Sequence, residues 1–255
     1  MDMSKWIVFI VIIILSIAII YFNTTTNKIS LKVKSKLNNF FYNVDEVNTD
    51  LRKIDNYKYK ILDETLKIYN DGWTDWPEKE LYHKKGSWKI FPFYAFGTWV
   101  NKNCMKCPTI YKFLRKVKGL KMALLSKMSP DMKLKPHKGW ASHSNYVVRC
   151  HYGLIVPDGC YISVSDLPLP EKGSEIDSIV LKNNEIKRYQ NKFKWLIFDD
   201  SKTHYAENTS NEDRIVLILD VERPSNIEIG KSDVGDSKEL IELVKYFRDN
   251  NIKIK

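Results

Sequence analysis

Cysteine is scarce in this chain, and its scarcity limits the possible architectures. The 255 residues include four cysteines, too few for the disulfide framework of a small secreted domain. Cys104 and Cys107 form a C-x-x-C pair, but Cys150 and Cys160 lack the spacing of a second metal-binding pair. No βαβ pattern surrounds the first pair, so a thioredoxin-like motif is not indicated. We therefore predict free or locally paired structural cysteines.

Arginine-rich stretches, internal repeats and low-complexity tracts are also lacking. The formal net charge is +10, but it comes mainly from scattered lysines rather than from a nucleic-acid-binding signature. Such a charge favours attraction to anionic surfaces, including lipid headgroups, so we do not expect nucleic acid as a partner. With 44% hydrophobic residues, the length suits one catalytic domain with attached segments.

The longest apolar run lies near the amino terminus, over residues 6–22. It contains no charge and is near the lower end of the length that spans a bilayer. A cleaved signal peptide needs small residues before the cut site, whereas Tyr21 and Phe22 close this run. We therefore predict a short tail at 1–5 and a retained transmembrane anchor at 6–22, which gives a single-pass membrane protein.

The side of the membrane stays open. Lys5 precedes the anchor and several lysines between residues 28 and 36 follow it, so the positive-inside rule favours a cytoplasmic catalytic domain. Sequons at Asn23 and Asn208 matter only on a lumenal side.

The rest of the chain divides into a polar stalk at 23–50, a main domain at 51–225 and a helical tail at 226–255. Residues 51–70 carry apolar positions at helical spacing. A possible capping box at 236–239 precedes an apolar stripe, which predicts a helix over 237–249. Short strands separated by turns are typical of a β-sandwich or barrel; we expect them at 88–94, 122–128, 146–156, 160–164, 194–198 and 214–221.

Charged and polar residues occur within these expected strands, and their presence there needs an explanation. Because side chains alternate along a strand, Arg149 and His151 share one face, and Cys150 and Tyr152 share the core-facing side. An inward Arg and His are costly without a ligand or a partner, so we expect either a bound ligand or a structural salt bridge. Arg214 begins the last apolar strand and offers a planar fork for a carboxylate.

Taken together, these segments resemble the aspartyl/asparaginyl β-hydroxylase family of Fe(II)- and 2-oxoglutarate-dependent dioxygenases. The resemblance covers about residues 85–225 and rests on His137-x-Gly139, Arg149-x-His151-x-Gly153-Leu154, residues 198–201 with His204, and Arg214 before an apolar strand ending at Asp220-Val221 and Pro224. Core motifs span 120–224. The resemblance implies a mainly β, double-stranded β-helix (jelly-roll, cupin-like) fold with flanking helices, here preceded by one transmembrane helix.

The resemblance implies that His137 and His204 are the Fe(II) ligands. The wider superfamily adds a carboxylate to two histidines, but that position is Gly139 here, and water takes the vacant place in this family. Asp200 would orient such a water. His143, in the loop after His137, is a candidate third ligand, but we expect it to be a solvent-exposed loop residue instead.

The same resemblance implies the cosubstrate contacts. Arg214 would pair with the distal carboxylate of 2-oxoglutarate, with Ser126 at the family's serine position. Arg149 and His151 would contact the cosubstrate from the other side. The implied cofactors are Fe(II), 2-oxoglutarate and O2, which together yield succinate, CO2 and a hydroxylated product.

The implied reaction is hydroxylation of an unactivated C–H bond. The first candidate substrate is the β-carbon of Asp or Asn in a peptide or protein. The second is a lipid acyl chain, as in the lipid A hydroxylases that also resemble this family. A candidate of another class is a non-catalytic membrane-bound interaction module, which loss of either histidine or of Arg214 would favour; all three are present.

Overall fold

The computed structural model describes residues 16, 18–24, 40–82, 87–169 and 185–249. It divides the chain into two units, residues 1–39 and 40–255. In the first unit, Ser16 and residues 18–24 are helical. Within the described residues, no helix is both long enough and apolar enough to cross a bilayer. Most of the predicted anchor at 6–22, and the stalk over 25–39, lie outside the described residues.

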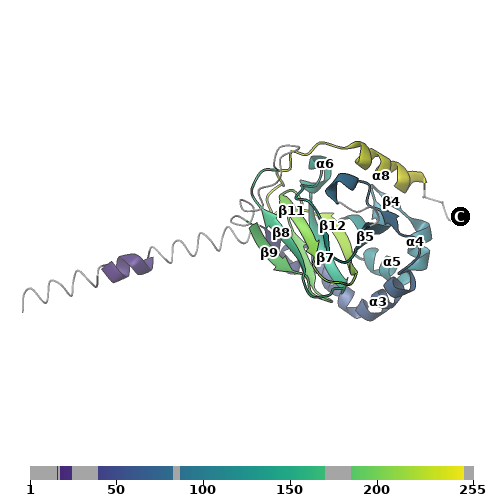
Figure 1. The fold of residues 1–255 in the computed structure, drawn as a ribbon, viewed down its shortest axis with the longest axis horizontal. Coiled ribbons are helices and arrows are strands. Elements are labelled where there is room, and N and C mark those ends of the chain that lie inside the picture. Colours follow the sequence, from purple (N-terminus) through teal and green to yellow (C-terminus); the bar gives the residue numbers. More distant parts are fainter. Residues whose placement is uncertain (1–15, 17, 25–39, 83–86, 170–184, 250–255) are drawn as a thin grey trace, which may run out of the picture. The chain divides into compact units, whose positions relative to one another are not determined.

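Two antiparallel sheets form the second unit (Figure 1). The strands of the larger sheet are β1 (Phe41–Tyr42), β2 (Thr74–Asp75), β3 (Trp88–Ala95), β4 (Thr98–Trp99), β5 (Leu120–Met128), β7 (Val147–Ile155), β10 (Trp195–Phe198) and β12 (Arg214–Glu222). They run in the order β1-β10-β7-β12-β5-β3-β2, with β4 paired to β3.

The smaller sheet runs in the order β6-β11-β8-β9. Its strands are β6 (Met132–Lys133), β8 (Cys160–Ser165), β9 (Glu185–Tyr189) and β11 (Thr203–Asn208). From β5 to β12 the chain alternates between the two sheets, except that β8 and β9 both lie in the smaller one. This is the strand order of a jelly roll. The predicted mainly β fold with flanking helices is confirmed.

The central strand β12 is buried on both faces. Val216 and Ile218 pack with Ile162 and Val164 of β8 in the core between the sheets, whereas the odd-numbered side chains from Ile215 to Val221 pack into a second core. Burial of each such aliphatic side chain contributes roughly 1.5–3 kcal/mol. By alternation, Arg214 and Asp220 share the inner face with Val216, so polar groups enter the space between the sheets at both ends of β12.

Helices cover the outer face of the larger sheet, on the side away from β8, β9 and β11 (Figure 1). They are α2 (Val44–Val47), the 3-10 helix η1 (Thr49–Asn56), α3 (Lys58–Lys67), α4 (Asn101–Lys106) and α5 (Pro108–Leu114). Ile61, Cys104 and Phe113 are buried in the outer core that they form with the sheet. The tail helix α8 (Lys238–Asp249) contacts β3 and β4, and buries Leu240 and Leu243 in the inner core.

The folded unit begins earlier than the sequence predicts. The stalk was expected to reach residue 50, but Phe40 and Phe41 are each 4% exposed, and β1 pairs with β10. Residues 40–50 therefore belong to the domain. The sequence does not reveal this, because residues 43–50 are mostly polar and Val47 is the only one of them that is buried.

Two further structural findings correct the sequence interpretation. No strand was expected around His204, but the residue lies in β11, a strand whose polar side chains hide the strand pattern. The sequon residue Asn208 is fully buried. Its Nδ2 donates to the carbonyls of Ser129 and Glu212 at 2.9 and 2.8 Å, so this fold cannot present it for glycosylation.

Candidate active site

The two motif histidines lie side by side, although they come from two separate segments of the chain. His137 and His204 form an isolated antiparallel bridge, with N–H···O distances of 2.9 and 2.8 Å in the two directions. Their ring centroids lie 4.3 Å apart. Because the backbone bridge fixes both Cα positions, the imidazoles face the same small volume.

Each imidazole has a defined tautomer. The Nδ1 atom of His137 lies 2.8 Å from the carbonyl oxygen of Lys135, and that of His204 lies 2.8 Å from the carbonyl of Lys202. A carbonyl only accepts hydrogen bonds, so each Nδ1 carries the proton and each Nε2 keeps a free lone pair. This is the arrangement in which a backbone carbonyl orients a metal-binding histidine.

Burial keeps both rings neutral. It lowers the pKa of His137 to about 3, with the neighbouring His204 adding to the effect. It also lowers the pKa of His204 to about 4, against the hydrogen bond to Lys202. Both histidines are therefore unprotonated near neutral pH, as metal ligation requires.

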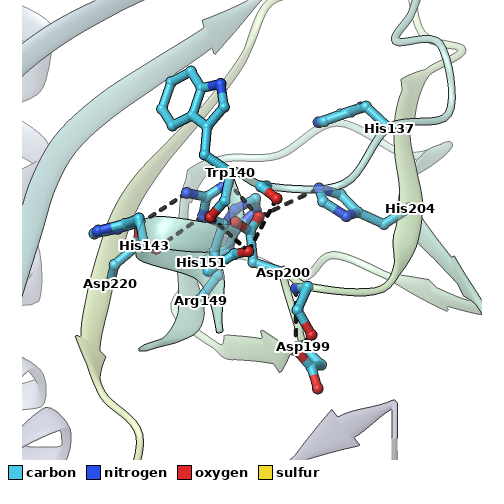
Figure 2. Close-up of polar contacts among 12 residues, drawn as sticks. His137, Trp140, His143, Arg149, His151, Asp199, Asp200, His204 and Asp220 are labelled. Carbon is cyan, nitrogen blue, oxygen red and sulfur yellow. Dashed lines mark hydrogen bonds and ion pairs between the residues drawn. The ribbon is translucent and has the colours of Figure 1, made fainter. Parts of the chain in front are cut away.

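Asp200 occupies the space beside the histidines where a third ligand would stand (Figure 2). Its Oδ1 lies 3.4 Å from His204 Nε2. A Cβ at Gly139 would lie 2.0 Å from Asp200 Oδ2, so no carboxylate side chain can grow from position 139. Among the described residues, no group of three or more His, Cys, Asp or Glu side chains could hold a metal ion. The geometry thus supplies two ring nitrogens and one adjacent carboxylate.

Arg149 lies between two buried carboxylates. It donates to Asp220 through Nε and Nη2, at 2.8 Å each, and forms an ion pair with Asp200 through Nη1. Burial lowers the pKa of Arg149, but Asp200 and Asp220 more than reverse this. Burial raises the pKa of Asp200 against the opposing effect of Arg149. In this structure Arg149 therefore positions Asp200, and its guanidinium already has carboxylate partners.

His143 is not the exposed loop residue that we expected. It lies in the short helix α6 (Ala141–Ser144), and its Nε2 is 2.8 Å from Asp220 Oδ2, with 17% of the side chain exposed. The expectation failed because the sequence does not reveal that Asp220, at the far end of β12, is the partner of this histidine.

Arg214 and His151 form a second polar group on the inner face. Arg214 is 1% exposed; its Nη2 donates to His151 Nδ1 at 3.2 Å and its Nη1 contacts the Met128 sulfur at 3.3 Å. Arg214 Nε and His151 Nε2 are buried without a hydrogen-bond partner in the described structure, where Arg214 also makes no ion pair. Because His151 Nδ1 accepts, its Nε2 carries a proton. Two unused donors beside a buried positive charge fit a carboxylate ligand.

Ser126 lies on β5, and its Cα pairs with Val216 of β12, two residues from Arg214. Its Oγ accepts a hydrogen bond of 3.0 Å from Trp88 Nε1, and the residue is 2% exposed. The structure thus places Ser126 on the inner face with Arg214, with its acceptor used by Trp88. Among the described residues, its hydroxyl hydrogen is bonded to no other group.

Two site residues, Asp220 and His143, were missed by sequence reasoning. A signal for the first was present, since residues 214, 216, 218 and 220 share one face of a strand. Asp220 therefore had to face inward with Arg214. No comparable pattern marks His143.

A neighbouring ion pair belongs to the scaffold. Arg223 donates to Asp199 at 2.7 and 3.1 Å, and Asp199 accepts from the backbone and hydroxyl of Ser201. These bonds fix the turn that presents Asp200, the next residue in the chain. All four cysteines are free and buried.

The part of the chain that carries the site matches a known protein family. The family model for aspartyl/asparaginyl beta-hydroxylase matches residues 55–224. Over 137 residues, the chain is 32% identical to the ornithine lipid ester-linked acyl 2-hydroxylase of Rhizobium tropici, covering 54% of this chain and 42% of that protein. It is 29% identical over 154 residues to human aspartyl/asparaginyl beta-hydroxylase, covering 58% and 17%. The chain thus spans less than half the length of these relatives.

Among solved structures, HygX from Streptomyces hygroscopicus with nickel and 2-oxoglutarate bound aligns with a TM-score of 0.48 at 12% identity, covering 71% of this chain and 90% of that one. The family model covers most of the folded unit and includes every site residue described above. The chain belongs to the aspartyl/asparaginyl β-hydroxylase family, whose members are dioxygenases.

Proposed function

We propose that this protein is an Fe(II)- and 2-oxoglutarate-dependent hydroxylase whose metal is held by His137 and His204. The observation that carries the proposal is the pair of neutral imidazoles with free Nε2 atoms, oriented by the carbonyls of Lys135 and Lys202. A dication bound there would be neutralised in part by Asp200, which lies 3.4 Å from His204 Nε2.

The residues around the metal would have separate tasks. Asp200 would accept a hydrogen bond from a water at the third protein position, and Arg149 would keep that carboxylate ionised and oriented. Arg214 and the Nε2–H of His151 would bind the distal carboxylate of 2-oxoglutarate, since both donors lack partners in the described structure. The bound metal and cosubstrate supply O2 activation, coupled to decarboxylation. Ser126 would donate its hydroxyl hydrogen to the same carboxylate.

The relatives point to one kind of target carbon. The β-carbon of Asp or Asn is bonded to a carbonyl carbon, and so is C2 of an ester-linked acyl chain. Family members are named for hydroxylation at the first, and the Rhizobium tropici relative is named for the second. We therefore infer that the substrate presents a methylene next to a carbonyl. The first candidate is Asp or Asn in a peptide or protein, and the second is a lipid acyl chain.

We also propose that residues 6–22 anchor the protein in a membrane, because this run is uncharged and apolar. The anchor would bring the domain within reach of lipids as well as proteins. Extraction of membranes at alkaline pH tests it: the full chain should stay in the pellet, and a variant with several lysines placed within 6–22 should be released.

The main experiment uses the full chain in detergent. Anaerobic titration with Fe(II) and 2-oxoglutarate should give binding, and succinate should appear after admission of air. His137→Ala, His204→Ala and Arg214→Ala should each abolish succinate formation, whereas Arg115→Ala, at an exposed position on α5's end, should not. A panel of Asp- and Asn-containing peptides and of acyl lipids would then be screened for a mass increase of one oxygen.

Each outcome has a clear meaning. Binding and succinate formation that depend on all three residues support the proposal, and the panel separates peptide from lipid. No metal-dependent binding by a folded protein would refute the site and favour the non-catalytic interaction module. Binding without succinate formation until a panel member is added would identify that compound as the substrate.

A further inference from the structure

A short segment beyond the family match contacts both histidine loops. Residues 230–236, the C-terminal strap, follow the end of the matched region at 224. The strap runs beside the loop 138–145 after His137 and reaches the turn 199–202 before His204. It precedes α8, whose Leu240 and Leu243 are each 6% exposed and pack in the inner core with Trp76 and Trp140. The strap is therefore fixed at its far end.

Asn145 is the main residue that binds the strap through hydrogen bonds. Its Oδ1 accepts a hydrogen bond of 2.7 Å from the backbone N–H of Ser232, and its Nδ2 donates to the Ser232 carbonyl at 3.1 Å. Its own carbonyl accepts from Gly230 N–H at 2.9 Å. One side chain thus binds both backbone groups of Ser232, as a neighbouring strand would.

Ser232 connects this clamp to the metal site. Its Oγ donates to the Gly139 carbonyl at 2.5 Å, while the Gly139 N–H donates to the Asp200 carbonyl at 2.9 Å. The Gly139 N–H is therefore held by Asp200, and the Gly139 carbonyl is held by the strap together with Ser144 Oγ, which donates to it at 3.0 Å. Since Gly139 is two residues after His137, these bonds limit how far that ring can move relative to His204.

The strap also contacts the turn 199–202 before His204, and Lys138, the residue next to His137. The Lys231 N–H donates to Ser201 Oγ at 3.1 Å. Asp233 pairs with Lys138 at 2.8 Å, and only 13% of the Lys138 side chain is exposed. A Cβ at Gly230 would lie 2.6 Å from Ser201 Oγ, so the close approach of strap and turn requires glycine there.

We propose that the C-terminal strap is a positioning element of the metal site, with Asn145 and Ser232 as its positioning residues. It holds the loop of His137 against the turn that carries Asp200, so that both Nε2 atoms stay aimed at one point. This inference rests on the proposed function, since it assumes a metal at the two histidines. Outer contacts that orient a metal ligand typically change metal affinity by 10–100-fold.

The test measures metal affinity and stability separately, in the full chain in detergent. Mn(II) binding is titrated by calorimetry for wild type, Asn145→Ala, Ser232→Ala and Ser232→Thr, and unfolding is followed by circular dichroism. Asn103→Ala is the control, because Asn103 is another side-chain amide that donates to a carbonyl, that of Pro92 at 2.7 Å, but it lies in α4 and is buried. Asn145→Ala and Ser232→Ala should each weaken Mn(II) binding roughly 10-fold or more.

The controls separate positioning from folding. Ser232→Thr keeps the hydroxyl and should restore affinity to within about threefold of wild type, while Asn103→Ala should lower the melting temperature without changing Mn(II) affinity. Affinities within twofold of wild type in both alanine variants would overturn the positioning role. If Asn145→Ala does not fold, Ser232→Ala alone decides. If wild type binds no Mn(II), the proposed function fails, and the strap inference with it.

Discussion

Arg149 and Asp220 face each other across neighbouring strands and form a two-pronged ion pair. Their Cα atoms are in register between β7 and β12, and two hydrogen bonds of 2.8 Å join the side chains. Asp220 is fully buried. Burial alone would raise the pKa of Asp220, but Arg149 outweighs it and holds that pKa well below its usual range. The sheet itself thus fixes the guanidinium that contacts Asp200.

The first prediction concerns this pair. Asp220→Ala should lower the free energy of unfolding by about 3–5 kcal/mol, because it leaves a largely buried arginine with one partner fewer and also removes the partner of His143. Urea unfolding measures the change. The control is Asp213→Asn, which alters an aspartate bonded to the Tyr69 hydroxyl at 2.7 Å; it should cost about 1 kcal/mol. Equal losses in the two variants would show that the Arg149 pair adds no special stability.

Much of the larger sheet could be predicted from the sequence, because its strands carry the hydrophobic pattern. The expected strand at 122–128 corresponds to β5, and those at 146–156 and 214–221 to β7 and β12. These strands are apolar on both faces, because helices cover the outer face and the smaller sheet covers the inner one. The helix at 237–249 was also predicted to within a residue. Its cap is Ser237, whose Oγ accepts from Leu240 N–H at 3.1 Å.

The strand β11 and the contacts within the site could not be predicted, because polar site residues stand there in place of a hydrophobic pattern. The strand β11 places His204 and Asn208 inward, so its pattern is that of a polar loop. The tie between His143 and Asp220 joins residues that are 77 positions apart, which no local pattern encodes. The motifs predicted the fold and the family. The partners of Arg149 could not be predicted, because they depend on the register of β7 against β12.

A second prediction concerns the cysteines. All four are buried and free, and burial raises the pKa of the Cys104 and Cys107 thiols to about 12. Because the thiolate is the reactive form, a colorimetric disulfide reagent should modify none of them within minutes in the native protein. After unfolding in urea, all four should react. A fast-reacting thiol in the folded protein, or fewer than four after unfolding without reductant, would contradict the buried, unpaired state.

A third prediction separates function from stability at Arg214. Arg214→Met removes a buried charge that has no carboxylate partner in the described structure, and such replacements are often neutral or stabilising. The urea midpoint without cosubstrate should therefore stay the same or rise. Binding of 2-oxoglutarate to the Mn(II)-loaded protein should weaken roughly 100-fold, since charge-assisted hydrogen bonds are lost.

The matched control for that prediction is Arg115→Met, which makes the same substitution at an exposed arginine that lies over the Tyr111 ring. It should leave 2-oxoglutarate affinity unchanged. A destabilised Arg214→Met with normal cosubstrate affinity would mean that Arg214 is a structural residue rather than a carboxylate-binding one.

The last prediction follows from the lowered pKa values of the two histidines. From an ordinary value of 6.5, the pKa falls to about 3 in His137 and about 4 in His204 on folding. Between these values and 6.5 the unfolded chain binds protons that the folded protein excludes, so stability should be full above 6.5 and fall as pH decreases. Each histidine should account for a loss of about 1–2 kcal/mol between pH 6.5 and about pH 5.

Urea unfolding of the metal-free protein with a chelator present tests this, by comparison with the double variant His137→Gln/His204→Gln. Burial also lowers the pKa of His151, but that residue is common to both proteins, so the difference between them isolates the pair. The double variant should lose about 2–4 kcal/mol less than wild type over this interval. Parallel pH profiles would mean that the two rings already carry protons in the folded state, and neutral imidazoles ready for a metal would then be ruled out at mildly acidic pH.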